Sequence, residues 1–457
     1  MLLGRYAAEL LSILAYGLRL AGSIIITPLA IRHLSSDELG YWYLLVNIGG
    51  AVALLDFGLT PNVTRACATF AAGAEDLSRH GSPSSEGEIS PNWPKIGGLV
   101  RQVKWLYLKI AFAAAVLMVF AFIGLRSTIS YGTDGSSPAE IWWVFTASTV
   151  ISAYTRSQPA LLIGLGKVAE CNHYTLIAAF TSISVVIGGL MLGYGLTIMV
   201  IGTAIQPAIL GLLCSLKINL LLKSSDRTCA TDTNLAALWP TTWRTGVVSV
   251  GAYMVNNASS IICAKYLGLS VLASFGLATQ LFTAVQTIAS VFLAVRVPAV
   301  VALMVRRRHT ELLRIVARAH ALGVACFIMG GVSICFAAPF ALKLIGSKTA
   351  LLPLPLLGVY AGVRFLEWNH SQFASLVMAD NQVPFVVPSI ASGFAIIAGS
   401  MLAIQYFGLW GVVLVTGGVQ AACNNWLPVL LGLRVLNCGL RRFARAMISE
   451  LSSALVR

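Results

Sequence analysis

Four arginines lie inside or near the ends of long apolar runs, where a positive charge is costly. They are Arg19 in LLSILAYGLRLAGSIIITPLAI (10–31), Arg156 in SAYTRSQPALL, Arg296 in FLAVRVPAVV and Arg364 in YAGVRFLEWNH. An arginine at the membrane centre costs roughly 2.5 to 3.5 kcal/mol on insertion scales, and several together approach the ~5 to 15 kcal/mol by which proteins are usually stable. Most of these guanidinium groups must therefore face protein or water, although Arg296 can extend toward the aqueous boundary.

Only two acids, Asp56 and Glu367, fall within the same apolar runs. Glu367 follows Arg364 by three residues, so the two can pair on one helical face, and both a structural pair and a binding role stay open for Arg364. Asp56 can pair with another arginine or cap local backbone. Arg19 and Arg156 cannot both be neutralised by these acids, which predicts a site for an anion, although carbonyls or polar side chains could serve one of them.

Uncharged polar residues accompany the arginines along the apolar runs. Thr279, Thr283 and Gln286 lie at positions i, i+4 and i+7 and share one helical face. Four further residues of this kind are Gln158, Asn256, Asn257 and Gln280. Interhelical hydrogen bonds explain each of them singly. Taken together with Asp56 and Glu367, they predict a polar, water-filled cavity.

The elements that position these residues follow from the composition. The chain has 457 residues, of which 57% are hydrophobic and 11% charged, and a water-soluble domain of this size cannot have such a composition. Runs of about 20 apolar residues are long enough to cross a bilayer as helices. Twelve such runs are predicted, at about 10–31, 39–60, 105–125, 141–163, 174–194, 196–216, 246–268, 271–298, 319–342, 352–378, 384–407 and 409–433. The first run is interpreted as a structural helix and not a cleaved signal peptide.

The distribution of basic residues predicts the orientation in the membrane. With both termini in the cytoplasm, most of the 31 Lys and Arg residues fall on cytoplasmic segments, as short loops require. These include Arg5, Arg65, Arg101, Lys104, Arg306–Arg308, Arg441, Arg442 and Arg445. The net charge of +14 is then a topology signal that also attracts anionic membrane lipids. Nucleic acid is not an expected partner, because the basic residues are dispersed over several short loops.

Loop composition divides the chain into four segments. An N-terminal six-helix bundle is expected over 1–222, with a cytoplasmic loop at about 66–104, followed by a linker at 223–245. A C-terminal bundle is expected over 246–436 and a cytoplasmic tail over 437–457. The tail has an amphipathic pattern, which is typical of a helix on the inner leaflet or of one docked on protein. The nine cysteines contain no CxxC pair and are interpreted as buried apolar residues, so neither a metal site nor a cofactor is predicted.

The two bundles show weak internal similarity. Residues 30–45, AIRHLSSDELGYWYLL, align with 263–278, CAKYLGLSVLASFGLA, and 194–205 align with 407–418. Both alignments pair corresponding spans in the same orientation. The expected fold is therefore an all-α membrane protein of about twelve helices, in two six-helix bundles related by a pseudo-two-fold axis along the membrane normal. Such bundles enclose a central cavity, as in alternating-access transporters.

Four features of the chain resemble the lipid-linked oligosaccharide flippases for O-antigen and other bacterial polysaccharides. These are LRLAGSIIITPLAIRHLSSDELGYWYLL (18–45), LLDFGLTPNVTR (54–65), KYLGLSVLASFGLATQL (265–281) and the six-plus-six layout. The superfamily also contains multidrug and toxin extrusion antiporters and lipid II flippases. The resemblance implies that a polyprenyl-pyrophosphate-linked oligosaccharide moves from the inner to the outer leaflet of the cytoplasmic membrane.

The resemblance also implies roles for the arginines. Arg19 and Arg156 would hold the pyrophosphate, and Arg296 and Arg364 are further candidates for the same role. A polysaccharide polymerase and glycosyltransferases are implied as partners. Relatives often have an acid in the seventh span, but this chain has NNASSIICAKYLG there, so ion coupling through that helix is not expected.

Two other functions remain as alternatives. A multidrug antiporter of the same fold would need cavity carboxylates for cationic drugs, and this chain has few of them. A membrane glycosyltransferase or polymerase would need a catalytic constellation, which the longest outside loop (126–140) lacks. The segment GLGK (164–167) does not match a phosphate-binding loop, so ATP hydrolysis is not expected and the chain is interpreted as a transporter and not an enzyme.

Overall fold

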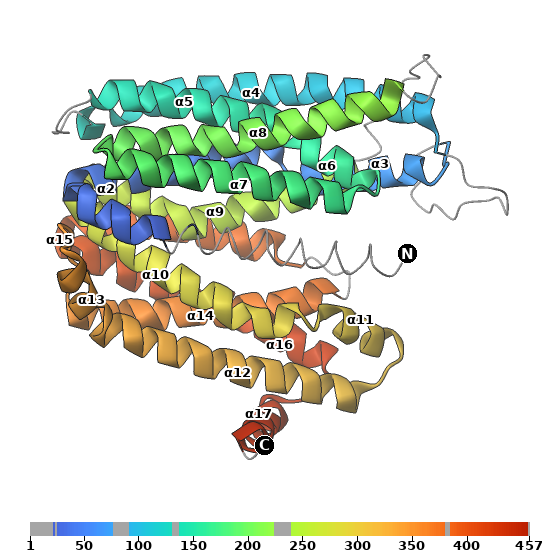
Figure 1. Ribbon diagram of the computed structural model, residues 1–457. Coiled ribbons are helices and arrows are strands. Elements are labelled where there is room, and N and C mark those ends of the chain that lie inside the picture. Colours follow the sequence, from blue (N-terminus) through green and yellow to red (C-terminus); the bar gives the residue numbers. More distant parts are fainter. Residues whose placement is uncertain are drawn as a thin grey trace. The chain divides into compact units, whose positions relative to one another are not determined.

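The computed structural model describes residues 22, 25–75, 91–129, 137–223, 239–379 and 384–455. Within these residues every regular element is a helix, and no strand occurs (Figure 1). The chain forms two compact units, Met1–Ser249 and Val250–Arg457. Helix α9 (Trp239–Leu267) begins in the first unit and ends in the second.

The first unit is built from long helices interrupted by short ones. Residues 25–33 are helical. The elements that follow are α2 (Ser36–Ala53), the 3-10 helix η1 (Leu54–Asp56), α3 (Leu59–Ala71), α4 (Trp93–Ile129), α5 (Pro138–Thr155), α6 (Ser157–Gly164), α7 (Val168–Met191) and α8 (Gly195–Lys223). Helix α8 packs against both α5 and α7, while α4 packs against α5 (Figure 1).

Local sequence explains where the first helices of this unit begin and end. Ser35 caps α2, and its hydroxyl accepts from the Glu38 N–H while the Glu38 carboxylate accepts from the Ser35 N–H. At the other end, η1 stops at Phe57 and Gly58, whose φ angles of 49° and 78° are left-handed. The predicted span 39–60 is therefore broken at this point, and the chain continues as α3.

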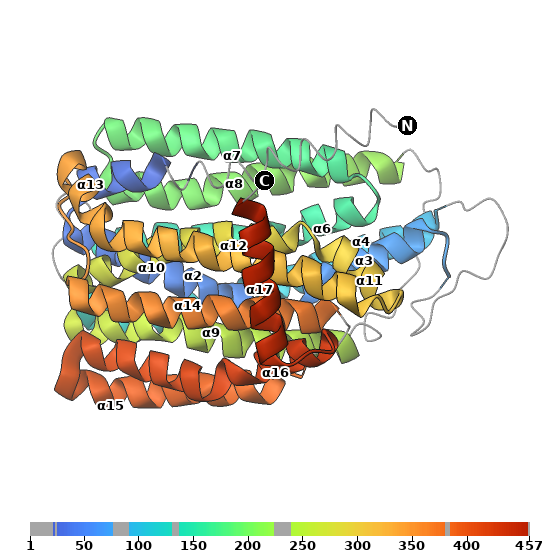
Figure 2. The ribbon, with the colours of Figure 1, turned by 90° about the horizontal axis from the view of Figure 1, so that it is seen from below.

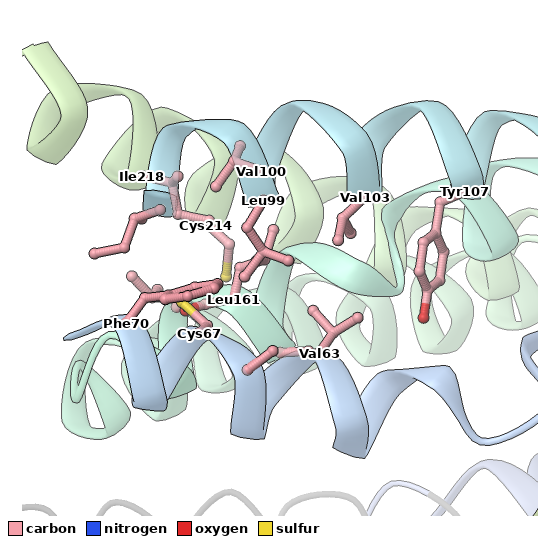
Figure 3. Close-up of a cluster of buried hydrophobic side chains, with 14 of the residues drawn as sticks. Val63, Cys67, Phe70, Leu99, Val100, Val103, Tyr107, Leu161, Cys214 and Ile218 are labelled. Atoms are coloured by element: carbon pink, nitrogen blue, oxygen red, sulfur yellow. The ribbon is translucent and has the colours of Figure 1, made fainter. Parts of the chain in front are cut away.

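A tightly packed apolar cluster lies where α3, α4, α6 and α8 meet (Figure 3). Cys67 of α3, Leu99 of α4, Leu161 of α6 and Cys214 of α8 are each completely buried in it. Tyr107 of α4 belongs to the same cluster and is labelled at one end of it in Figure 3. The two thiols thus pack as apolar groups, as the sequence predicts.

The second unit has the same mixture of long and short helices. After α9 come α10 (Leu269–Ala294), α11 (Val297–Val305), α12 (His309–Phe336), α13 (Ala338–Ile345), α14 (Leu354–Ala379), α15 (Val386–Val419), the π-helix η3 (Gln420–Asn424), α16 (Trp426–Val435) and α17 (Leu440–Leu455). Helix α10 packs against α12 and α14, and α17 packs on α12 (Figure 2).

The terminal helix α17 is docked on protein, which is one of the two placements that its amphipathic pattern allows. Phe443 is buried and its ring lies 5.7 Å from the ring of His320 on α12. The Phe443 ring also contacts Phe373 of α14 at a centroid distance of 5.5 Å. Glu450 forms an ion pair with Arg314 of α12 at 3.4 Å.

Eight of the described helical stretches are long and apolar enough to cross a membrane. Helix α14 is not among them, because Arg364, Glu367 and the polar residues near them lower its mean hydropathy. The first predicted span, 10–31, lies mostly outside the described residues. These helices, together with the high share of hydrophobic residues, show that the chain is a multi-pass helical membrane protein.

The boundary predicted between the last two spans, 384–407 and 409–433, is confirmed at Gly408. Its φ of 54° and ψ of −136° are not helical, and they separate two helical stretches of α15. This conformation is open to glycine and strained for a residue with a Cβ atom.

Gly408→Ala is expected to lower the free energy of unfolding by about 1 to 3 kcal/mol, since the added Cβ meets no neighbour and strain is the only effect. Thermal unfolding of the purified protein in detergent measures this loss. The matched control is Gly418→Ala, where the Cβ also meets no neighbour but the backbone is helical, so stability should hold or rise. Equal stability of the two variants would contradict the strain at Gly408.

Candidate functional site

A cavity with charged walls lies inside the first unit. Its volume is about 210 Å³. The lining residues are Val46, Gly49, Val52, Ala53, Asp56, Tyr107, Ile110, Phe145, Ser148, Thr149, Ser152, Ala153, Arg156 and Thr203. Two of the charged residues singled out from the sequence, Asp56 and Arg156, are thereby brought to one pocket from positions 100 residues apart in the chain.

The Asp56 carboxylate is buried and accepts several hydrogen bonds. Thr60 donates to it twice, from its hydroxyl at 2.8 Å and from its N–H at 3.2 Å. The Tyr107 hydroxyl also donates to it, and lies 3.1 Å from the Thr60 hydroxyl. Asp56 thus caps the first turn of α3 and ties that turn to α4. Donors occupy both carboxylate oxygens, so little acceptor capacity remains for a ligand.

Arg156 lies in the single-residue break between α5 and α6. Its Nη1 donates to the Ala53 carbonyl at 3.2 Å, which joins the break to the end of α2. Within the described part of the chain Arg156 forms no ion pair with a carboxylate. A guanidinium group has five N–H donors, so one backbone contact leaves most of its donor capacity for a ligand in the pocket.

Hydroxyl groups from α5 and α8 form another wall of the pocket. The Ser148 hydroxyl has one proton to donate and lies 3.1 and 3.3 Å from the carbonyl oxygens of Val144 and Val200. Thr149 donates to the Thr146 carbonyl at 2.8 Å. Because their protons point at backbone carbonyls, the oxygens remain as weak acceptors toward the pocket. Neither this wall nor Tyr107 was predicted from the sequence as part of a site. The spacing of Ser148, Thr149 and Ser152 on one helix could have indicated the wall.

Gln158 does not line this pocket. It is buried in α6, with 2% of its surface exposed, and its Oε1 atom has no hydrogen-bond partner in the described structure. The short helix α6 packs mainly against α3. The proposed role of Gln158 in a cavity therefore remains a prediction.

A second and much smaller cavity lies inside the other unit, with a volume of about 20 Å³. Arg364, Glu367, Asn256 and Gln420 contribute its polar wall. Arg364 is 7% exposed, and its Nη1 atom pairs with the Glu367 carboxylate at 2.6 Å, as the spacing of three residues on one helix predicts. The volume suffices for about one water molecule, not for a ligand group.

The polar stripe of α10 forms hydrogen bonds with α14. Thr283 accepts from Arg364 Nη2 at 2.8 Å, and Gln286 donates to the Arg364 carbonyl at 2.8 Å. Two more hydrogen bonds between α10 and α14 lie on either side of these. The Thr279 hydroxyl lies 2.8 Å from the Tyr360 hydroxyl, and the Ser290 hydroxyl accepts from Gln372 Nε2 at 2.9 Å. These contacts are interhelical hydrogen bonds, which the sequence also allowed as an alternative to a water-filled cavity.

The remaining candidate residues have the following positions. Asn256 and Asn257 donate to the carbonyls of Ala252 and Tyr253 on their own helix, and Gln280 is half-buried on α10. Arg296 lies in the turn between α10 and α11 and donates to the Phe292 carbonyl, one of the last of α10. Arg19 lies outside the described residues.

Comparison with solved structures identifies proteins of the same fold. An inward-facing multidrug resistance MATE family transporter of the MOP superfamily matches with a TM-score of 0.62 and 14% identity, over 93% of this chain and 95% of that one. Lipid II flippase MurJ in an inward closed conformation matches at 0.57 and 13%, over 98% and 91%. The MATE multidrug transporter DinF-BH, in a complex with a ligand, matches at 0.59 and 12%, over 95% and 97%.

No protein-family model matches the sequence, and the search of curated proteins found no match. Similarity at 12% to 14% identity concerns the fold. The predicted all-α fold in two helical bundles is confirmed by these matches over most of the chain.

Tyr107→Phe is expected to destabilise the protein by about 1.5 to 3 kcal/mol, because it removes a hydrogen bond to the buried Asp56 carboxylate. Tyr266→Phe is the matched control, since Tyr266 is 42% exposed and the same change there should stay within about 0.5 kcal/mol. Thermal unfolding in detergent compares them, and an unaltered Tyr107→Phe variant would show that the hydroxyl contributes no stability.

Glu367→Gln is expected to cost about 3 kcal/mol or more, because it leaves the buried Arg364 guanidinium without its counter-charge. The double variant Arg364→Gln with Glu367→Gln should regain part of this loss. Glu311→Gln serves as the control, since its partner Arg308 and Glu311 itself are more than half exposed and such pairs contribute at most about 1 kcal/mol. A small effect of Glu367→Gln in the same unfolding assay would argue against a buried pair.

Proposed function

We propose that this protein is a flippase that moves an anionic, polyprenyl-pyrophosphate-linked oligosaccharide from the inner to the outer leaflet of the cytoplasmic membrane by alternating access. It would act in cell-surface polysaccharide biosynthesis, with both termini in the cytoplasm. The shared fold with MATE transporters and with lipid II flippase MurJ supports transport across the membrane. The distribution of basic residues supports the orientation.

The observation that carries the proposal is the hydrogen bonding of the two charged groups in the pocket of the first unit. Its carboxylate, Asp56, already accepts from Thr60 and Tyr107. Its guanidinium, Arg156, contacts a carbonyl and no described carboxylate. The pocket therefore presents donors of a positively charged group, and phosphate or pyrophosphate matches their forked geometry.

The size of the pocket supports recognition of one group and not of the whole substrate. Its volume of about 210 Å³ is below the range of roughly 300 to 1,000 Å³ that is typical of sites enclosing a drug-sized ligand. A single charged headgroup fits this size. The lipid tail would stay in the membrane, and Arg19 remains the second proposed contact to the pyrophosphate, with Arg296 as a further candidate.

The multidrug antiporter alternative needs an acceptor for a cationic drug. Among the described residues that line the pocket Asp56 is the only carboxylate, and its lone pairs are directed at Thr60 and Tyr107. Arg156 in the same pocket adds repulsion for a cation. The anionic substrate is therefore the better match. Either an ion gradient or removal of the product on the outside would drive the transport.

Arg156→Gln is expected to slow translocation at least 10-fold, since a charge-assisted hydrogen bond contributes about 1.5 to 3 kcal/mol and 1.4 kcal/mol is a factor of ten. The measurement is transbilayer movement of a fluorescent polyprenyl-pyrophosphate oligosaccharide in vesicles containing the purified protein. Arg156→Lys, which keeps the charge but loses the fork, should fall in between. The control is Arg65→Gln, which changes an exposed arginine outside the pocket.

Movement of the labelled lipid at the wild-type rate in Arg156→Gln would exclude Arg156 as a substrate contact. Transport of a cationic dye by the wild-type protein, lost in Asp56→Asn, would favour the multidrug antiporter. Folding of every purified variant is checked by gel filtration in detergent, so a lost fold is distinguished from a lost site.

A further inference from the structure

The terminal helix α17 lies at a steep angle to the helices that it covers. Figure 2 shows it crossing α12 and α14, and in Figure 1 it is seen nearly end-on beneath α12. It is fixed there by Phe443 against His320 and Phe373, and by Glu450 paired with Arg314. Because α12 is one of the candidate membrane spans, a helix that lies across it runs along the membrane plane.

The contacts along α12 place α17 at the edge of the hydrocarbon layer. Helix α12 has 28 residues and is thus about 42 Å long, whereas the hydrocarbon core is about 30 Å thick. The first ten residues of α12 contain Glu311, Arg314 and Arg318, while the stretch 319–336 has no Asp, Glu, Lys or Arg. The hydrocarbon boundary therefore falls near residue 318, between Arg314 and His320, two of the α12 residues that contact α17.

The face of α17 that is not packed on protein carries both basic and apolar groups. Arg441, Arg442 and Arg445 are exposed, and Arg445 Nε donates to the Arg441 carbonyl at 3.4 Å. Leu440 and Ile448 are 56% and 70% exposed. Guanidinium groups beside exposed leucine and isoleucine are typical of a helix that lies in the headgroup layer, with its apolar side chains directed at the acyl chains.

We propose that α17 binds the headgroups of anionic phospholipids through Arg441, Arg442 and Arg445. The charge complementarity of three exposed arginines and the position at the hydrocarbon boundary both select this ligand over a soluble one. Each basic residue near an anionic surface adds attraction of about 1 kcal/mol, so three of them provide a clear preference over zwitterionic lipid. The site is separate from the pocket around Arg156 and does not depend on the proposed substrate.

The test compares phosphatidylglycerol and phosphatidylcholine bound to the purified full-length protein by native mass spectrometry. Wild-type protein is expected to retain phosphatidylglycerol preferentially. The triple variant R441Q/R442Q/R445Q should bind it roughly 100-fold more weakly, which corresponds to about 1 kcal/mol for each arginine. The matched control R65Q/K109Q/K223Q removes the same charge from exposed positions of the first unit and should weaken binding less than the triple variant of α17 does. R441K/R442K/R445K should keep the preference.

Two further measurements keep the proposal open to refutation if the triple variant is not recovered folded. Each single substitution to glutamine should weaken binding several-fold, and raising the salt concentration to about 1 M should release the lipid, because the screening length falls to about 3 Å. Equal retention of both lipids by the wild-type protein would overturn the proposal. It would indicate that the basic face is covered by an acidic protein or by a second copy of the chain.

Discussion

The cost of burying a guanidinium group in an apolar environment is the constraint on which both candidate sites depend. An ionised group taken out of water must find a counter-charge or enough hydrogen-bond acceptors. Arg364 finds both, in Glu367 at 2.6 Å and in the polar stripe of α10. Arg156 donates to one carbonyl, that of Ala53, and lines a pocket. The first arrangement is complete within the protein, and the second still has donors for an anion.

This difference follows from the helices on which the two arginines lie. Arg364 lies within a continuous α-helix, so its neighbours one turn away and on the adjacent helix surround it. Arg156 lies in a break between two helices, where the side chain is directed at the end of α2. A break in a membrane helix leaves backbone groups that must be satisfied, and it is tolerated where the residues line a cavity or are buried in protein. Asp56, at the end of η1, borders the same cavity.

The smaller cavity of the second unit also adjoins an irregular helix. Gln420 lines it and begins the π-helix η3, where Asn424 donates to Gln420 Oε1 at 3.1 Å and accepts from Ser392 at 2.9 Å. Such π-turns are rare and recur where polar groups must be brought together. Here the side-chain hydrogen bonds connect Ser392, near the start of α15, with η3, which follows the end of that helix. The second unit thus encloses its polar groups, while the first unit leaves a pocket beside them.

The sequence by itself determined the features that depend on neighbours within a few residues. Apolar runs of membrane length specified helices, Gly408 separated the last two spans, and the spacing of Arg364 and Glu367 specified their pair, because each of these follows from local backbone geometry. Only the tertiary structure decided that Tyr107 reaches Asp56 and that Arg156 meets Ala53 across 103 positions of the chain. Such contacts depend on how helices distant in sequence pack, and apolar helix surfaces alone allow many packings, so composition and periodicity do not specify which polar groups meet.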